Sequence, residues 1–287
     1  MEGRTAAERS TAPATAGAPL ISVVTPVYNG SRYLEDLIVS VREQDHPRVE
    51  HIVIDDGSDD DGATVRVLQK HPHLNWWSHA NKGQYATLND GLRAAGGDWI
   101  CVISADDLLA SPTALSALLA GAGNGKGFDA VFGRTRLVDG GGRDLRSDRY
   151  RLDESAPKWI NHHFLTIHHC SMLVSRRFVE ANDLFFDTSL RYTGDWDWII
   201  RILKLGRTKF VDTPVSRYRV HEQQTRQTTA RAALGAEDRL VLARHGSSRL
   251  VRSVIVGYAR LRKLRGLLAA EGRSGAARAF HRFLRRH

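Results

Sequence analysis

Apolar runs of strand length alternate with helical patterns along residues 20–107, and this alternation constrains the fold more than any other feature. Four strands are predicted over residues 20–29, 49–58, 74–80 and 98–107, and the helices between them over residues 31–44, 60–71 and 83–97. Strands joined by helices of this length form crossover units with parallel strands. The strands are continuously apolar, which is typical of a sheet covered on both faces. The pattern predicts an α/β fold with a mainly parallel, Rossmann-like sheet flanked by helices.

The second half of the chain has a different pattern. Four segments are predicted: a strand, a Gly-rich turn and a returning strand over residues 128–146, a strand and a helix over 168–182, a helix over 194–206, and a last strand over 209–221. After Glu222 the sequence is helical and basic to its end. We therefore predict a disordered leader over residues 1–18, a main domain over 19–225 in two halves (19–110 and 111–225), and a basic helical C-terminal extension over 226–287.

The composition is that of a soluble globular protein, with 42% hydrophobic and 25% charged residues among 287. No apolar run is long enough to span a bilayer, and the N-terminus lacks the apolar core of a secretion signal. Both cysteines, Cys101 and Cys170, lie in apolar surroundings, which favours a reducing compartment over a disulfide framework. These features predict a cytoplasmic protein. The net charge of +9 indicates either an acidic partner or a solvated basic surface.

Acidic residues follow two of the predicted strands. Asp55 and Asp56 end the second strand, and Asp106 and Asp107 end the fourth. Two carboxylates about 4 Å apart repel by roughly 4 kcal/mol at an effective dielectric of 20. Adjacent strand ends lie about 5 Å apart, so the four carboxylates are expected in one crevice, where Mg²⁺ or Mn²⁺ and a phosphorylated ligand would balance their charge. The alternative is that acids at strand ends form turns or helix caps, as we expect for residues 59–61.

Several motifs, in this order, resemble the glycosyltransferase family 2 domain of the GT-A fold: TPVYNG, VIDDGSDD, NKGQYATLNDG and ISADD. The resemblance continues from HHCSMLVSRRFVEAN through TGDWDW to SRYRVHEQQT and covers about residues 20–225. Several motifs in order are far more specific than any one of them. The resemblance implies an inverting transferase that moves a sugar from a nucleoside diphosphate sugar, usually a UDP-sugar, to a hydroxyl acceptor. Residues 19–110 would bind the nucleotide, and residues 111–225 would bind the acceptor.

The resemblance also implies roles for the first two strand ends. Thr25, Pro26 and Tyr28 match the segment that cups the nucleotide base. Asp56 matches the carboxylate that reads the base, and Asp55 supports it. We therefore expect these five residues to bind the nucleotide sugar.

Asp106 and Asp107 match the end of the family's Asp-x-Asp motif, which binds the metal and, through it, the diphosphate. We expect Asp107 and Asp106 to make the metal and ribose contacts, with Mg²⁺ or Mn²⁺ as the cofactor. The first aspartate of the motif is replaced here by Ser104. This departure keeps open the alternative of a catalytically weak or inactive GT-A scaffold that binds a nucleotide or sugar.

TGDWDW resembles the family segment that carries the catalytic base, and the matching residue is Asp195, with Gly194 in a place often taken by Glu. A carboxylate flanked by Trp196 and Trp198 in a partly desolvated cleft would have its pKa raised toward that of a general base. Asp197 is the second candidate. The alternatives are that Asp195 only caps a helix and that the tryptophans pack in the core rather than stack on a sugar.

A departing diphosphate needs cations near it. The candidates are Lys82, Arg201, Arg219 and His221. His221 matches a histidine that approaches the metal or phosphate in relatives, although a structural role is the alternative, and Arg201 is also expected to brace its helix. The histidine pairs at 162–163 and 168–169 lack the spacing of a metal-binding motif, so we interpret them as cleft lining that faces the acceptor rather than as a metal site.

The acceptor is expected to be a saccharide or lipid-linked saccharide in bacterial cell-surface polysaccharide or glycolipid synthesis. Residues 250–270 combine an apolar stripe with arginines, which favours peripheral contact with the inner face of an anionic membrane, or with a partner protein. The tail lacks the interleaved aromatic residues of single-strand binders, which argues against nucleic acid.

Overall fold

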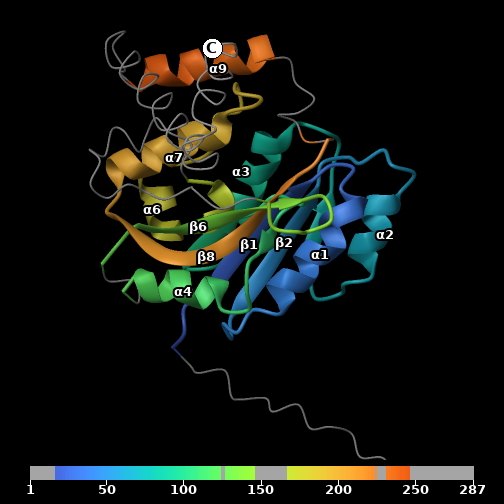
Figure 1. The fold of residues 1–287 in the computed structure, drawn as a ribbon, viewed down its shortest axis with the longest axis horizontal. Coiled ribbons are helices and arrows are strands. Elements are labelled where there is room, and N and C mark those ends of the chain that lie inside the picture. The colour runs from blue at the N-terminus through green and yellow to red at the C-terminus, as the bar shows by residue number, and fades with distance from the viewer. Residues whose placement is uncertain (1–16, 124–126, 146–166, 223, 225–230, 246–287) are drawn as a thin grey trace, which may run out of the picture.

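The computed structural model describes residues 17–123, 127–145, 167–222, 224 and 231–245 (Figure 1). In chain order its elements are β1 (Ile21–Val27), α1 (Ser31–Arg42), β2 (Val49–Asp55), α2 (Ala63–Gln69), β3 (Asn75–Ser78), α3 (Gln84–Ala94), β4 (Trp99–Val102), β5 (Leu108–Leu109), α4 (Ala114–Gly121), β6 (Ala130–Asp139), η1 (His169–Ser171), β7 (Met172–Ser175), α6 (Arg176–Ala181), α7 (Gly194–Leu205), β8 (Thr208–Val220) and α9 (Arg231–Arg244). The leader over 1–16, the histidine pair at 162–163 and the extension over 246–287 lie outside the described residues.

The strands form one sheet in the order β3-β2-β1-β4-β7-β6-β8-β5. The first four are parallel, as the alternating pattern predicts, and β7 then pairs antiparallel with both β4 and β6. Val24 of β1 lies opposite Ile52 of β2 on one side and Val102 of β4 on the other. The two acidic strand ends are therefore not adjacent, because β1 separates them. This corrects the expectation that their carboxylates lie on neighbouring strands.

Helices cover both faces of the sheet (Figure 1). On one face α3, α6 and α7 pack against the sheet through a large cluster that includes Leu88, Val179 and Trp198. On the other face α1 and α4 contribute Leu37 and Leu118 to a second cluster. β1, β4 and the second part of β2 are almost fully buried between these layers, which explains their continuous apolar runs, whereas β3 is partly exposed. The prediction of an α/β fold is confirmed.

The structure differs from the sequence-based prediction in several elements: η1 takes the place of the first residues of a predicted strand, and the predicted strand returning after the Gly-rich turn is reduced, in the described residues, to one bridge between Val138 and Asp144. Two further elements are absent from that prediction. The short helix α4 fills part of residues 111–127, and the two-residue strand β5 pairs with β8. Both cysteines are buried and free. No helix in the part of the chain that the structure describes has the length and apolar character needed to cross a membrane.

His51 lies on β2 and is almost fully buried, with its Nε2 3.1 Å from the Thr25 hydroxyl. Burial, with the nearby His73 and His71, lowers its pKa from 6.5 to about 3. Between these two values the unfolded chain binds a proton that the folded chain does not, so stability falls as the pH falls through this window. Each pH unit below 6.5 lowers the free energy of unfolding by about 1.4 kcal/mol.

We therefore expect His51 to remove about 2 kcal/mol of unfolding free energy between pH 6.5 and pH 5. Urea unfolding of the wild type and of His51→Gln at both pH values measures this contribution. Glutamine keeps a polar partner for Thr25 but does not titrate, so its stability should fall less over the same interval. Equal pH dependence in the two proteins would contradict the buried neutral state of His51.

Candidate functional site

The carboxylates at the end of β2 anchor the loops around them. Asp55 Oδ1 accepts a hydrogen bond from Ser58 N at 3.1 Å. Asp56 accepts the backbone N–H groups of Lys82 at 2.9 Å and of Gly83 at 3.0 Å, which fixes the loop before α3. Both carboxylates are almost fully buried. Asp56 thus ties the end of β2 to the loop between β3 and α3.

The end of β1 contributes one exposed aromatic residue. Thr25 and Pro26 are buried within the strand, and the Thr25 hydroxyl contacts His51 rather than solvent. Tyr28 is 49% exposed, and its hydroxyl donates to Asp59 Oδ1 at 3.1 Å. Of the three residues expected to cup a base, Tyr28 alone has an open aromatic face.

The second acidic pair splits into an open and a buried carboxylate. β5 pairs antiparallel with β8, and Leu108 lies opposite Arg217. The residues before β5 therefore lie beside the C-terminal end of β8. There the side chain of Asp106 is 29% exposed, and its Oδ2 lies 3.0 Å from His221 Nε2. Gln224 Nε2 donates to the same oxygen at 3.4 Å. The carboxylate and the imidazole share one partly open position.

Asp107 is fully buried. Its Oδ1 accepts the backbone N–H of Arg219 at 3.0 Å, and burial, followed by the charge of Asp106, raises its pKa well above the usual range. The Arg219 guanidinium is buried too, and it donates hydrogen bonds to the carbonyls of Asp106 and Gly140 and to the carboxylate of Asp36. The buried contacts between Arg219 and the pair Asp106 and Asp107 therefore join the segment after β4 to β8. The expectation that Asp107 faces a metal conflicts with its complete burial.

A chain of polar contacts crosses from β4 to α7. The antiparallel pairing of β7 with β4 brings η1 close to the end of β4, and His169 Nε2 lies 3.1 Å from Ser104 Oγ. On its other side His169 Nδ1 lies 3.4 Å from Asp195 Oδ2. A proton on Nδ1 suits both contacts, since Nε2 then accepts from the Ser104 hydroxyl. The side chain of Asp195 is 32% exposed at the first turn of α7.

Tyr85 of α3 explains why a glycine precedes Asp195. The Tyr85 hydroxyl donates to Asp195 Oδ1 at 3.4 Å. A Cβ placed on Gly194 would lie 2.7 Å from the Tyr85 ring, closer than carbon atoms approach. Burial and the Asp195 charge raise the pKa of Tyr85 well above its usual value, so the phenol stays neutral. Tyr85 occupies the space that a side chain at position 194 would need.

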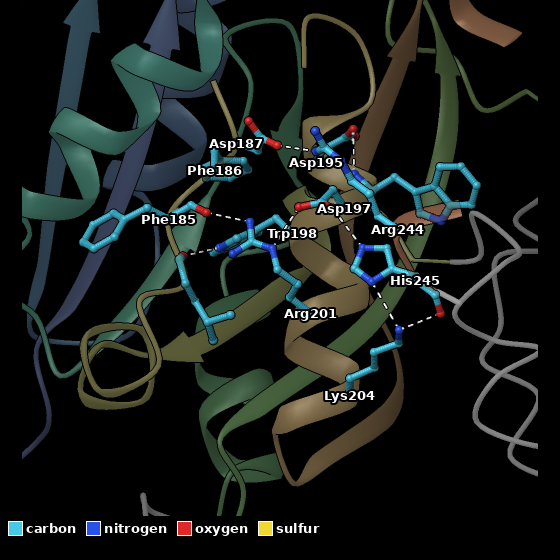
Figure 2. Close-up of polar contacts among 12 residues, drawn as sticks. Phe185, Phe186, Asp187, Asp195, Asp197, Trp198, Arg201, Lys204, Arg244 and His245 are labelled. Carbon is cyan, nitrogen blue, oxygen red and sulfur yellow. Dashed lines mark hydrogen bonds and ion pairs between the residues drawn. The ribbon is translucent and has the colours of Figure 1, made fainter. Parts of the chain in front are cut away.

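Asp197 lies one residue beyond Trp196 and is held differently, as Figure 2 shows. It is buried between Arg201 Nε and His245 Nε2, both at 2.8 Å. Burial opposes its ionisation, but the hydrogen bond from His245 and the charge of Arg201 outweigh it and lower the pKa of Asp197. Arg201 also donates to Phe185 O. These contacts fit the expectation that Arg201 braces its helix, because its guanidinium binds Asp197 and the Phe185 carbonyl and not the residues that follow β1, β2 or β4.

Both tryptophans of this segment belong to the core. Trp198 is fully buried, and its Nε1 donates to Leu184 O at 2.6 Å while its ring stacks on Phe186. Trp196 is 6% exposed. Both rings are therefore part of the core and do not stack on a sugar.

Lys82, a candidate phosphate-binding residue from the sequence, has its ammonium paired with Asp90 on α3.

Asp106 and His221 are the candidate metal ligands. Within the described ranges no group of three or more His, Cys, Asp and Glu side chains is arranged to hold a metal ion by itself. A carboxylate oxygen beside an imidazole nitrogen nevertheless suits a divalent ion that takes its other ligands from water and a diphosphate. The donor set therefore fits Mg²⁺ or Mn²⁺ bound together with a nucleotide.

The chain is similar to known proteins both in sequence and in structure. A model of glycosyl transferase family 2 matches residues 22–182. An uncharacterized glycosyltransferase of Rickettsia typhi is 29% identical over 218 residues, which cover 73% of this chain and 67% of that protein. The chondroitin synthase of Escherichia coli is 27% identical over 198 residues, which cover 68% of this chain and 28% of that protein.

Among solved structures, S. aureus TarS in complex with UDP-GlcNAc aligns with a TM-score of 0.61 at 20% identity. The alignment covers 74% of this chain and 61% of that one. At this identity the likeness shows the fold, and the curled sheet flanked by helices is that of the GT-A fold.

Proposed function

The chain belongs to glycosyl transferase family 2, and we propose that it transfers a sugar from a UDP-sugar to a hydroxyl group of a saccharide or lipid-linked saccharide, with inversion at the anomeric carbon. The likeness to TarS, solved with UDP-GlcNAc, supports the donor. The relative named chondroitin synthase supports a polysaccharide acceptor. Bacterial cell-surface polysaccharide or glycolipid synthesis, at the inner face of the membrane, is the setting we infer.

One observation carries this proposal: the contact chain Ser104–His169–Asp195. It begins at the end of β4, two residues before Asp106, and ends on a partly exposed carboxylate of α7. These contacts link the proposed base to the proposed diphosphate site. An inverting transferase needs these two groups on opposite sides of the anomeric carbon.

Asp195 is the proposed general base. It takes the proton of the acceptor hydroxyl while the acceptor oxygen bonds to the anomeric carbon and the bond from that carbon to the diphosphate oxygen breaks. The Tyr85 hydroxyl donates to one of its oxygens and His169 Nδ1 lies 3.4 Å from the other, so both oxygens have a neighbour that orients the carboxylate before the acceptor arrives. Asp197 is unsuited to this role because Arg201 and His245 occupy it.

Tyr28, Asp55 and Asp56 form the proposed nucleotide wall, and Asp106 with His221 form the proposed metal position. A divalent cation bound there would supply positive charge to the departing diphosphate. The Asp106 side chain is partly exposed, and His221 and Gln224 contact its Oδ2. We assign Asp107 to the support of this turn, because its carboxylate is buried against Arg219.

Release of UDP from UDP-N-acetylglucosamine, UDP-glucose and UDP-galactose, with Mn²⁺ and saccharide acceptors, tests the proposal. We expect the full chain to release UDP from at least one donor, faster with an acceptor present. Asp183→Asn is the matched control for later variants, since Asp183 is exposed and its φ of 49° is tolerated by asparagine. Failure to release nucleotide from these donors and from GDP- and dTDP-sugars would favour the scaffold alternative.

A further inference from the structure

A single carboxylate of α9 holds the segment that leads into α7. Glu237 accepts the backbone N–H groups of Arg191 at 2.9 Å, Tyr192 at 2.8 Å and Thr193 at 3.1 Å. It also accepts the Thr193 hydroxyl at 3.1 Å. Four donors from three consecutive residues thus converge on one side chain. In Figure 1 α9 lies beside α7, outside the layers that cover the sheet.

The position of this carboxylate matters because Thr193 is the N-cap of α7. The N–H groups at the start of a helix lack intrahelical partners, and the positive end of the helix dipole favours a negative charge there. The Thr193 side chain does not cap the helix itself, since its hydroxyl donates to Glu237. Asp195 follows Thr193 by two residues, so Glu237 fixes the backbone that carries the proposed base.

Two further contacts join the end of α9 to the same region (Figure 2). Arg244 forms an ion pair with Asp187, which precedes residues 191–193, and His245 binds Asp197, which follows them. Lys204 of α7 donates to the His245 carbonyl at 2.9 Å. The segment from Asp187 to Asp197 is therefore held at three points by α9 and by His245, which follows it, while the Asp195 side chain stays 32% exposed.

We propose that Glu237 is a positioning residue for Asp195: it holds residues 191–193 so that the base keeps its orientation toward the acceptor hydroxyl. The inference rests on the proposed function, because it takes Asp195 as the base. Glu237 lies beyond residues 22–182, to which the family model matches. A helix outside the matched region thus completes the catalytic half of the domain.

The test uses the full chain with Glu237→Gln, which keeps the length of the side chain but removes its charge and offers an amide N–H group to the same donors. We expect the turnover number for UDP release to fall about tenfold or more, since small displacements of a catalytic group have effects of this size. The KM for the UDP-sugar should stay within about twofold, because the donor site lies at the β-strand ends. Amide hydrogen exchange should accelerate at residues 191–195 and stay unchanged in β1, β2 and β4.

Glu180→Gln is the control, since this glutamate on α6 is exposed and its carboxylate pairs with Arg176 of the same helix. Should Glu237→Gln fail to fold, Thr193→Ala removes one of the four bonds to the carboxylate and should lower turnover in the same direction with KM unchanged. An unchanged turnover number in a folded Glu237→Gln, or in Thr193→Ala where Glu237→Gln does not fold, overturns the inference.

Asp195→Asn, measured beside these variants, separates the two claims. If Asp195→Asn is inactive and Glu237→Gln turns over like the wild type, the positioning role alone is wrong. If Asp195→Asn keeps wild-type turnover, or the wild type releases no UDP from any of the three donors, the proposed function fails and this inference fails with it.

Discussion

Asp195→Asn should lower the turnover number by about 10² to 10⁴, the range that a general base contributes. The amide keeps the size of the side chain and its contact with Tyr85, but it takes no proton from an acceptor. Binding of UDP should stay within about twofold of the wild type, because Asp195 lies on α7 and not at the ends of β1 and β2. Steady-state UDP release and separate UDP titrations give the two quantities.

Asp183→Asn, the matched control, should behave like the wild type in both measurements. A wild-type turnover number in Asp195→Asn would mean that another group takes the proton. Asp197 is the nearest carboxylate in the sequence, but its pairing with Arg201 and His245 would then have to break.

Asp106→Asn should weaken Mn²⁺ binding in the presence of UDP by about 10- to 100-fold or more. Loss of supporting contacts around a metal already has effects of this size, and Asp106 is a proposed ligand. The electron paramagnetic resonance signal of free Mn²⁺ measures the bound fraction directly. Asp107→Asn is the matched comparison, since its buried amide oxygen can still accept the Arg219 N–H.

We expect Asp107→Asn to bind Mn²⁺ and UDP within about threefold of the wild type. The reverse result, with strong loss at Asp107 and little at Asp106, would contradict the division between the exposed and the buried carboxylate. It would restore Asp107 as a metal contact, which the motif suggests.

The layered fold could be predicted because each strand and helix between residues 20 and 107 has a local pattern. The order of the strands could not, because it depends on contacts between distant segments. The placement of β1 between β2 and β4 decides which acidic groups meet, and nothing in the acidic motifs indicates it. The antiparallel strand β7 then brings His169 to Ser104, a contact between residues far apart in the sequence.

In the site, too, the residue types could be predicted from local sequence, whereas the contacts between distant residues could not. The HHCS motif draws attention to His169, but its two contacts require the fold. The burial of Asp107 follows from Arg219 on β8. Glu237 has no local signal at all, because one glutamate on a basic helix resembles any solvated charge. Sequence patterns identify residue types suited to the chemistry, whereas burial and partners decide which of them face the substrate.

The most direct test of the central claim is calorimetric titration of the purified chain with UDP, with Mn²⁺ and again with excess EDTA. The account predicts saturable binding with Mn²⁺ and at least about tenfold weaker binding without it, since Asp106 and His221 hold the metal that meets the diphosphate. No binding of UDP, GDP or dTDP under either condition would contradict it and leave the crevice as part of a scaffold without a nucleotide site.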